Sequence, residues 1–303
     1  GRKTDVKDSE WLAELMLHGL LKPSFIPPKP QRVLRELTRY RTRLVQERAR
    51  VVNRVQKLLE GANIKLSSVA SDIMGVSARA MLAEIVAGQT DAEQMAELAQ
   101  GRMRSKIREL EKALTGVVQP HHRFVLAQQL DHIDFLDEKV ETLSIRIGQQ
   151  LESMGWPDEP SESDASQGTG EGTGVADESE LPLTWDAAVA LLDTIPGVSQ
   201  RIAEVMLAEM GLDMSQFPTA DHLASWAGLA PGNHQSGGKR YSGRTTKGNK
   251  PLSSILVQGA WSAVRSKDTF LKSRYHRLAA RRGKKRAIVA VAHSMLVSAW
   301  HML

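Results

Sequence analysis

Cysteine is absent from this 303-residue chain, and aromatic residues make up only 5% of it. The first absence excludes disulfide scaffolds, thiolate zinc sites and cysteine nucleophiles, and it suits a reducing compartment. The second argues against base-stacking platforms as the main binding device. Long hydrophobic runs are also missing: the longest weakly charged apolar stretch, Ala287–Leu303, is interrupted by serine and histidine. It predicts a buried helix rather than a membrane span.

Acidic residues are nearly missing from residues 239–286, which hold fifteen Lys or Arg and a single acid, Asp268. A block with a net charge of +14 attracts polyanions such as nucleic acids. Residues 157–180 show the reverse, with eight acids and no Lys or Arg. Because that stretch has almost no large apolar side chains, it predicts a disordered acidic linker over 155–180.

Apolar residues recur at nearly heptad spacing in two segments, which predicts two long helices with matching seams. The first seam, in residues 32–59, consists of Val33, Leu37, Tyr40, Leu44, Val51, Val55 and Leu58, with arginine-rich polar faces and Gly61 as the expected C-terminal cap. The second, in residues 124–151, consists of Leu126, Leu130, Ile133, Leu136, Val140, Leu143 and Ile147. Two such seams predict an antiparallel coiled-coil hairpin, or arms that pair between subunits.

The chain as a whole is therefore predicted to be mainly α. Shorter helices are expected over residues 9–21 and 64–116. We divide the chain into residues 1–22, a coiled-coil or helical arm at 23–154, the linker at 155–180 and a helical domain at 181–303. In the last, Asn249 can cap a helix that has Pro251 just inside it, whereas Ala230–Thr246 is ambiguous.

A helix–turn–helix pattern surrounds Ile195-Pro196-Gly197-Val198-Ser199. It resembles the helix-hairpin-helix motif, in which a tight turn exposes backbone N–H groups at a helix N-terminus, where phosphate is favoured. Such contacts position DNA without reading its sequence. Ser199 departs from the pattern, which usually has a second glycine there. An ordinary helical corner is the alternative.

Ser236 lies beside the Gly237-Gly238 pair and is followed by four basic residues that reach to Lys247: Lys239, Arg240, Arg244 and Lys247 itself. A serine hydroxyl among cations is a candidate nucleophile, because cations stabilise the charge that builds on a phosphoryl group. The alternative is a solvated Gly/Ser/Lys connection without chemistry.

Asp5 and Asp8 are three residues apart at an expected helix entrance, so their carboxylates can share one side of the first turn. Clustered oxygens suit Mg²⁺, although two carboxylates are a poor site without further ligands. Either aspartate could instead be a helix N-cap. His293, on an apolar helix, is interpreted as a satisfied core or surface histidine rather than a base.

These signals together resemble the Piv-like DEDD transposases, the recombinases of the insertion-sequence one-ten group. The resemblance covers nearly the whole chain in order: K-x-D-x-x-D at Lys3–Asp8, the arm, the Ile-Pro-Gly turn, Gly228-Leu229-Ala230-Pro231, Ser236-Gly237-Gly238-Lys239 and Thr246-Lys247-Gly248-Asn249.

The resemblance implies an N-terminal RuvC-like domain of RNase H fold that holds a divalent metal, Mg²⁺, with four carboxylates. Asp5 and Asp8 match the last two, and the other two are expected upstream of Gly1. It also implies a serine nucleophile at Ser236, strand exchange through a phosphoserine link to DNA, a structured guide RNA and a homo-oligomer joined through the arm. A start without Met and an end inside an apolar helix suggest an N-terminally truncated fragment.

Three hypotheses follow. The first is a DNA transposase in which Ser236, Asp5 and Asp8 are catalytic, while Pro196–Ser199 and the four basic residues bind DNA. The second is a non-catalytic DNA-binding and oligomerisation fragment, and the third a decayed copy of a mobile element. The expected localisation is a bacterial cytoplasm, in association with the nucleoid and without membrane contact.

Overall fold

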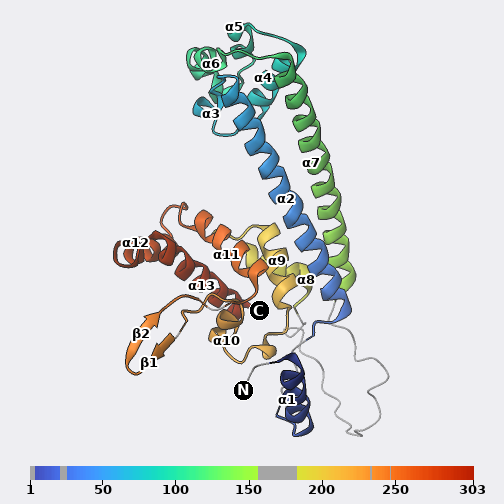
Figure 1. Cartoon of the computed structure of the whole chain (residues 1–303), viewed down its shortest axis with the longest axis vertical. Coiled ribbons are helices and arrows are strands. Elements are labelled where there is room, and N and C mark those ends of the chain that lie inside the picture. The colour runs from blue at the N-terminus through green and yellow to red at the C-terminus, as the bar shows by residue number, and fades with distance from the viewer. Residues whose placement is uncertain (1–3, 21–25, 156–182, 233, 246) are drawn as a thin grey trace, which may run out of the picture. The chain divides into compact units, whose positions relative to one another are not determined.

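The computed structural model describes residues 4–20, 26–155, 183–232, 234–245 and 247–303 (Figure 1). Helices dominate, which confirms the predicted mainly α class. The chain divides into two compact units, one of residues 36–154 and one of residues 1–35 and 155–303. Apart from Gly155, the linker predicted for 155–180 lies outside the described residues.

The first unit, which we call the arm, is built on two long antiparallel helices, α2 (Lys29–Gly61) and α7 (Pro120–Met154), although α2 up to Arg35 belongs to the second unit. Arg41 Nη1 donates to Ser144 Oγ at 3.4 Å, and Arg48 Nη2 donates to Asp137 Oδ2 at 2.9 Å. Along and beyond these polar contacts the helices share an apolar core whose members include Leu44, Val51, Val55, Leu126, Leu130, Ile133, Leu136 and Val140. The two predicted seams thus face each other.

The buried face of α2 differs in part from the predicted seam. Tyr40 is 53% exposed, whereas Thr38 and Arg41 are buried, and Leu59 is more deeply buried than Leu58. An apolar count misses this shift because two of the buried positions are polar. Arg41 can be tolerated there because its long side chain reaches a hydroxyl acceptor.

The end of α2 also lies beyond the expected cap. Gly61 is the last helical residue, and the left-handed conformation falls on Asn63, with φ of 60°. The Ile64 N–H donates to the carbonyl of Leu59 at 2.8 Å across this turn. Asparagine tolerates this conformation better than most residues with a Cβ, so it serves where glycine was predicted.

Five short helical segments lie between α2 and α7: α3 (Leu66–Val69), α4 (Val76–Ala87), α5 (Ala92–Ala96), a 3-10 helix (Gly101–Lys106) and α6 (Ile107–Leu114). In Figure 1 they gather where α2 ends and α7 begins. Their apolar residues join the core of the arm, including the fully buried Met81, Leu82 and Leu110.

The second unit contains most of the predicted motifs. Its elements are α1 (Asp5–Leu17), α8 (Trp185–Asp193), α9 (Gln200–Met210), a 3-10 helix (Met214–Gln216), α10 (Ala220–Trp226), β1 (His234–Ser236), β2 (Lys239–Ser242), α11 (Lys250–Ala263), α12 (Phe270–Arg282) and α13 (Lys284–Met302). Asn249 caps α11, since its side chain accepts from the Leu252 N–H, as predicted.

Helix α13 is the core helix of this unit and packs against α10, α11 and α12. Val291, Ala292, Met295 and Leu296 are fully buried along it. The apolar C-terminal stretch is therefore a buried helix, as its composition predicted. Among the described residues, no helix is both long and apolar enough to cross a bilayer.

Candidate functional site

Two of the predicted motif segments lie backbone against backbone in the second unit. A Cβ on Gly248 would lie 2.2 Å from the backbone nitrogen of Gly228, and one on Gly232 would lie 2.1 Å from the carbonyl oxygen of Arg244. Such distances leave room for glycine only. The Gly-Leu-Ala-Pro segment and the segment from Gly243 to Asn249 are thus brought together, because neither crossing glycine carries a side chain.

Between these segments the chain makes a two-stranded antiparallel hairpin, β1–β2. Ser236 is the last residue of β1 and pairs with Lys239, the first of β2. The two turn residues, Gly237 and Gly238, have φ of 55° and 73°, the signs that a type I′ turn requires. This hairpin lies within the stretch whose sequence was ambiguous, and its turn follows from the glycine pair.

The structure places the predicted nucleophile at the tip of this hairpin, and Figure 1 shows the hairpin projecting from the helices of its unit. The side chains of Ser236 and Arg240 lie outside the described part of the chain. The side chains of Lys239, Arg244 and Lys247 are exposed.

A buried polar contact holds Asn249, the last residue of the second crossing segment. Asn249 Nδ2 donates to Glu209 Oε2 at 2.7 Å, and Arg35 Nε lies 3.4 Å from the same oxygen. Arg35 also donates to the backbone carbonyls of Ala208 and Glu209. The side chain of Glu209 has no exposed surface. This carboxylate therefore links the first turns of α2 to the residue that caps α11.

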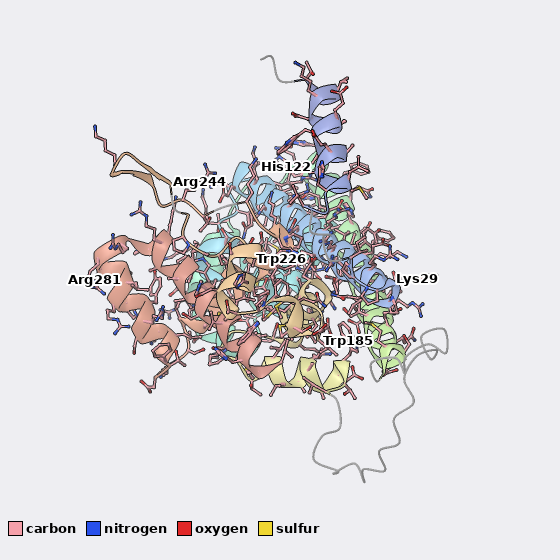
Figure 2. All side chains as sticks on the ribbon, turned by 90° about the horizontal axis from the view of Figure 1, so that it is seen from below. Lys29, His122, Trp185, Trp226, Arg244 and Arg281 are labelled. Carbon is pink, nitrogen blue, oxygen red and sulfur yellow. The ribbon has the colours of Figure 1, made fainter. Side chains whose placement is uncertain are left out.

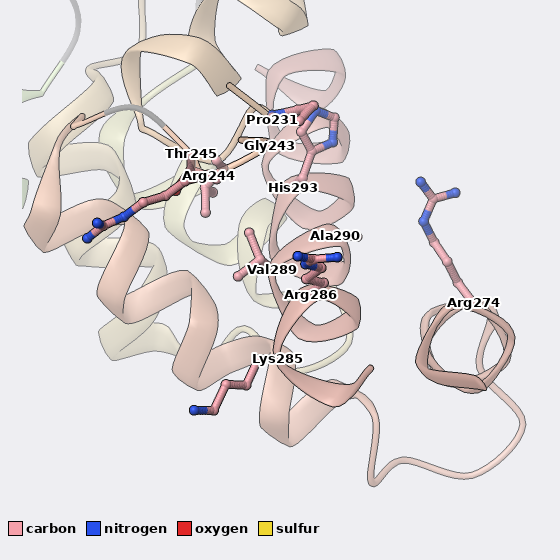
Figure 3. A pocket seen from close by; sticks show the side chains of 11 residues that line it. Pro231, Gly243, Arg244, Thr245, Arg274, Lys285, Arg286, Val289, Ala290 and His293 are labelled. Carbon is pink, nitrogen blue, oxygen red and sulfur yellow. The ribbon is translucent and has the colours of Figure 1, made fainter. Parts of the chain in front are cut away.

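A cavity of about 740 Å³ opens next to the crossing segments, and Figure 3 shows its lining. Residues of α13 form one wall, with Pro231, Gly243 and Thr245 near His293, while Arg274 comes from α12. Four of the lining side chains are permanently or normally cationic: Arg244, Arg274, Lys285 and Arg286. In Figure 2, Arg244 and Arg281 both point outward from this unit. The predicted cation Arg244 thus lines the same cavity as three cations that were not singled out from the sequence.

His293 lines the same cavity. Burial is the main cause that lowers its pKa below the ordinary value of 6.5, and the charge of Arg274 lowers it further, while Asp221 opposes both. The imidazole is therefore mainly neutral at pH 7, with one donor and one acceptor nitrogen. We expected an inert histidine. Its spacing from Arg286 and Ala290 along α13, seven and three residues, is the signal that could have placed it on the cavity face.

The turn between α8 and α9 contains the predicted DNA-contacting residues. Pro196 and Ser199 are exposed and Val198 is buried. Gly197 has φ of 87°, and a Cβ there would lie 2.4 Å from the carbonyl oxygen of Gly259 in α11. One side of the turn is thus packed on α11, and the exposed side presents the N-terminus of α9.

The two predicted metal ligands lie in the first turn of α1. That helix begins four residues earlier than expected because Thr4, not an aspartate, is its N-cap: its hydroxyl accepts from the Lys7 N–H at 3.4 Å. Asp5 is exposed, and Asp8 is half-buried. Within the described residues, no three His, Asp or Glu side chains are grouped so that they could hold a metal ion. Two carboxylates alone do not provide the octahedral ligand set that Mg²⁺ demands.

Comparison with known proteins gives these motifs a common context. Residues 189–276, which include the α8–α9 turn, the hairpin and both crossing segments, match the model of the "Transposase IS116/IS110/IS902 family". Residues 1–64, which include Asp5 and Asp8, match a second model, that of the DEDD transposases of IS110 type. Two separate regions of the chain are thus similar to the IS110 family of transposases.

Individual relatives agree with this family. The chain is 33% identical over 120 residues to the transposase for insertion sequence element IS1111A of Coxiella burnetii, a match that covers 37% of the chain and 32% of that relative. It is 44% identical over 73 residues to the pilin gene-inverting protein of Moraxella bovis, covering 23% of the chain and 22% of that relative. It is 32% identical over 122 residues to a probable family 20 transposase of Pseudomonas aeruginosa, covering 39% and 36%. The matches thus span about a third or less of each relative.

Proposed function

We propose that this chain carries out the DNA strand exchange of an IS110-family transposase, with Ser236 as the nucleophile. The observation that carries the proposal is the position of Ser236 beside the Gly-Gly turn of an exposed hairpin, next to Lys239 and followed by the crossing segment that holds Arg244 and Lys247. This hairpin lies inside the region that matches the transposase family.

The proposed reaction conserves the phosphodiester bond energy. The Ser236 oxygen attacks a DNA phosphorus and loses its proton, a sugar hydroxyl leaves with a proton, and a serine–phosphate ester forms. The hydroxyl of a second strand then attacks the same phosphorus and releases the serine. Lys239, Arg240, Arg244 and Lys247 hold the phosphate oxygens and stabilise the charge that builds in each step.

DNA is positioned by the α8–α9 turn, which we assign the role of a helix-hairpin-helix. The exposed N-terminus of α9 offers backbone N–H groups to a phosphate, and Pro196–Ser199 shape the approach. The packing of Gly197 against α11 supports this role, because it fixes the direction of α9 relative to the rest of the unit.

The arm is proposed to join subunits as a coiled coil. Its α2–α7 pair leaves several large apolar side chains exposed, including Tyr40, Phe135 and Ile145. Such side chains gain stability when a second copy covers them. A structured guide RNA, implied by the family, belongs to the same proposal and would use the net positive surface of the chain.

The metal implied by the family takes no step in this scheme. Asp5 and Asp8 are proposed as two ligands of a divalent ion, in a RuvC-like domain of which residues 1–22 would form part. The described residues alone do not complete such a site.

The test is Ser236→Ala, assayed for strand exchange and DNA binding in this chain and in a version extended upstream. We expect exchange, and any protein–DNA adduct that survives denaturing gel electrophoresis, to be lost while DNA affinity stays within about twofold. Ser254→Ala, an exposed serine near the start of α11, is the matched control and should retain full activity. Full exchange by Ser236→Ala would refute the nucleophile.

The non-catalytic DNA-binding and oligomerisation fragment is the second candidate. The incomplete carboxylate set favours it for the present 303 residues. Comparison of the two chain lengths separates the candidates: exchange by the extended version alone favours the binder, and equal exchange by both excludes it.

A further inference from the structure

The basic cavity combines two kinds of wall. Leu229, Pro231, Val289 and Ala290 supply apolar surface, while Arg244, Arg274, Lys285 and Arg286 supply positive charge. A volume of about 740 Å³ falls in the range of pockets that bind small organic ligands, on the order of 300–1,000 Å³. Contacts to a duplex backbone need charge but no cavity. The apolar wall therefore calls for a ligand that has an apolar part as well as an anionic one.

The helix that forms one wall begins in an unfavourable way. Its first turn holds Lys284, Lys285 and Arg286 and no acid. Cations at this end are repelled by the partial positive charge of the helix N-terminus. A sequence that breaks this rule on an exposed turn beside a cavity indicates a bound anion that compensates for the repulsion.

Arg274 provides an independent indication from another helix. Its Nε is buried and has no hydrogen-bond partner in the described residues, while its guanidinium carbon lies 6.0 Å from the centre of the Phe270 ring. A buried donor without an acceptor is costly, so this guanidinium has hydrogen-bonding capacity that the described residues leave unused. Guanidinium groups suit phosphate oxygens because their donors form a planar fork.

We propose that this cavity binds one unstacked nucleotide of a DNA or RNA strand. The phosphate is held by cations of the lining, and the base lies against Leu229, Pro231 and Val289. His293, at the same wall, can both donate to and accept from the polar edge of the base. The inference rests on the proposed function, since it names how the strand-exchange unit would hold a nucleotide that has left its stack.

The test uses 2-aminopurine deoxyribonucleoside 5′-monophosphate, whose fluorescence reports whether its base is in water or packed. The whole chain should give a saturable fluorescence change that both dAMP and AMP reduce by competition. The ratio of these two competitors distinguishes a DNA strand from an RNA strand as the source. Inorganic phosphate should compete at least tenfold less well than either. Equal competition by inorganic phosphate would reduce the site to a plain anion site and overturn the proposal.

Two variants test the apolar and the cationic parts of the cavity lining separately. Ala290→Phe fills the apolar part without changing charge and should weaken the probe at least tenfold, whereas Ala280→Phe, on the exposed face of α12, should leave it unchanged. Arg274→Met removes one cation and should weaken the probe severalfold, so it tests the site even if Ala290→Phe fails to fold. Wild-type affinity in a folded Ala290→Phe, or in Arg274→Met, would overturn the proposal.

The inference and the proposed function fail separately. Probe binding without any strand exchange would leave the pocket standing and refute the transposase chemistry. Strand exchange that depends on Ser236, in a chain that does not bind the probe, would refute the pocket alone.

Discussion

The arm and the C-terminal part of the second unit, residues 183–303, are both mainly helical, but their interiors are built differently. The arm is held by a continuous apolar core with charged pairs such as Arg48–Asp137 at its surface. Residues 183–303 bury two glutamates, Glu204 and Glu209, and cross their own backbone at glycines. They also hold a cavity with four cations.

This difference shows where function lies in the chain. The arm follows the rule of helix periodicity along most of its core, with Thr38 and Arg41 as buried exceptions on α2, which is enough for a structural element. The C-terminal part departs from them at buried charges, at close backbone crossings and at the start of α13. Departures of this kind are expected where a protein spends stability on a functional site.

The largest expected effect tests the apolar basis of the arm. Ile133→Ala removes a side chain that is 1% exposed and should lower the free energy of unfolding by about 4 kcal/mol. Phe135→Ala, two residues along the same helix and 52% exposed, should change it by less than about 0.5 kcal/mol. Hydrogen exchange followed by mass spectrometry would resolve the arm peptides. Similar losses of protection in the two variants would contradict a single buried seam.

The next effect tests the backbone contacts of the C-terminal part. Gly197→Ala should destabilise by about 3 kcal/mol, because left-handed strain of about 1–2 kcal/mol adds to overpacking of about 1–3 kcal/mol against α11. Gly283→Ala has a similar φ of 81° but no atom within 4 Å of the added Cβ. Denaturant unfolding gives the loss in the free energy of unfolding for each variant, and the difference between the two losses measures the clash with α11. Equal losses would mean that the turn is not packed on α11.

A smaller effect tests the buried charge. Arg35→Met leaves the Glu209 carboxylate without this cation and should lower the free energy of unfolding by about 2 kcal/mol. The loss is smaller than for a fully buried ion pair because Asn249 still donates to Glu209 and Arg35 is 19% exposed. Glu209→Gln in the same chain should recover part of the loss, with a coupling energy of at least about 1 kcal/mol. Arg32→Met, an exposed position on the same helix, is the control. Strict additivity in the double-mutant cycle would show that the two side chains do not interact.

The smallest effect concerns the cavity and its histidine. NMR titration of His293 should give a pKa below 6.5. This pKa should rise when Arg274→Met removes a like charge and fall when Asp221→Asn removes an opposite one. Since the pKa in the folded state is the lower one, the stability from this group is present above pH 6.5 and is lost as the pH falls below it. A pKa that does not move in Arg274→Met would place Arg274 away from His293.

Much of the arm could be predicted from residue order, and much of the candidate site could not. The second seam was predicted correctly, whereas in α2 the choice between Leu58 and Leu59 depended on polar residues that a pattern of apolar residues leaves out. The motifs around Gly197, Ser236 and Asn249 were found from short signals. The cavity was not, because Arg244, Arg274 and His293 come from a loop and two helices that no local pattern joins.

The sequence by itself determined the helical class, the cap at Asn249 and the excess of positive charge. Each of these depends on interactions within a few residues or on composition alone, so residue order is enough. The tertiary structure decided which cations line one cavity, which carboxylate accepts a hydrogen bond from Asn249 and which glycines have no room for a Cβ. Those depend on the packing of segments far apart in the chain, where a shift of one residue along a helix turns a side chain to another face.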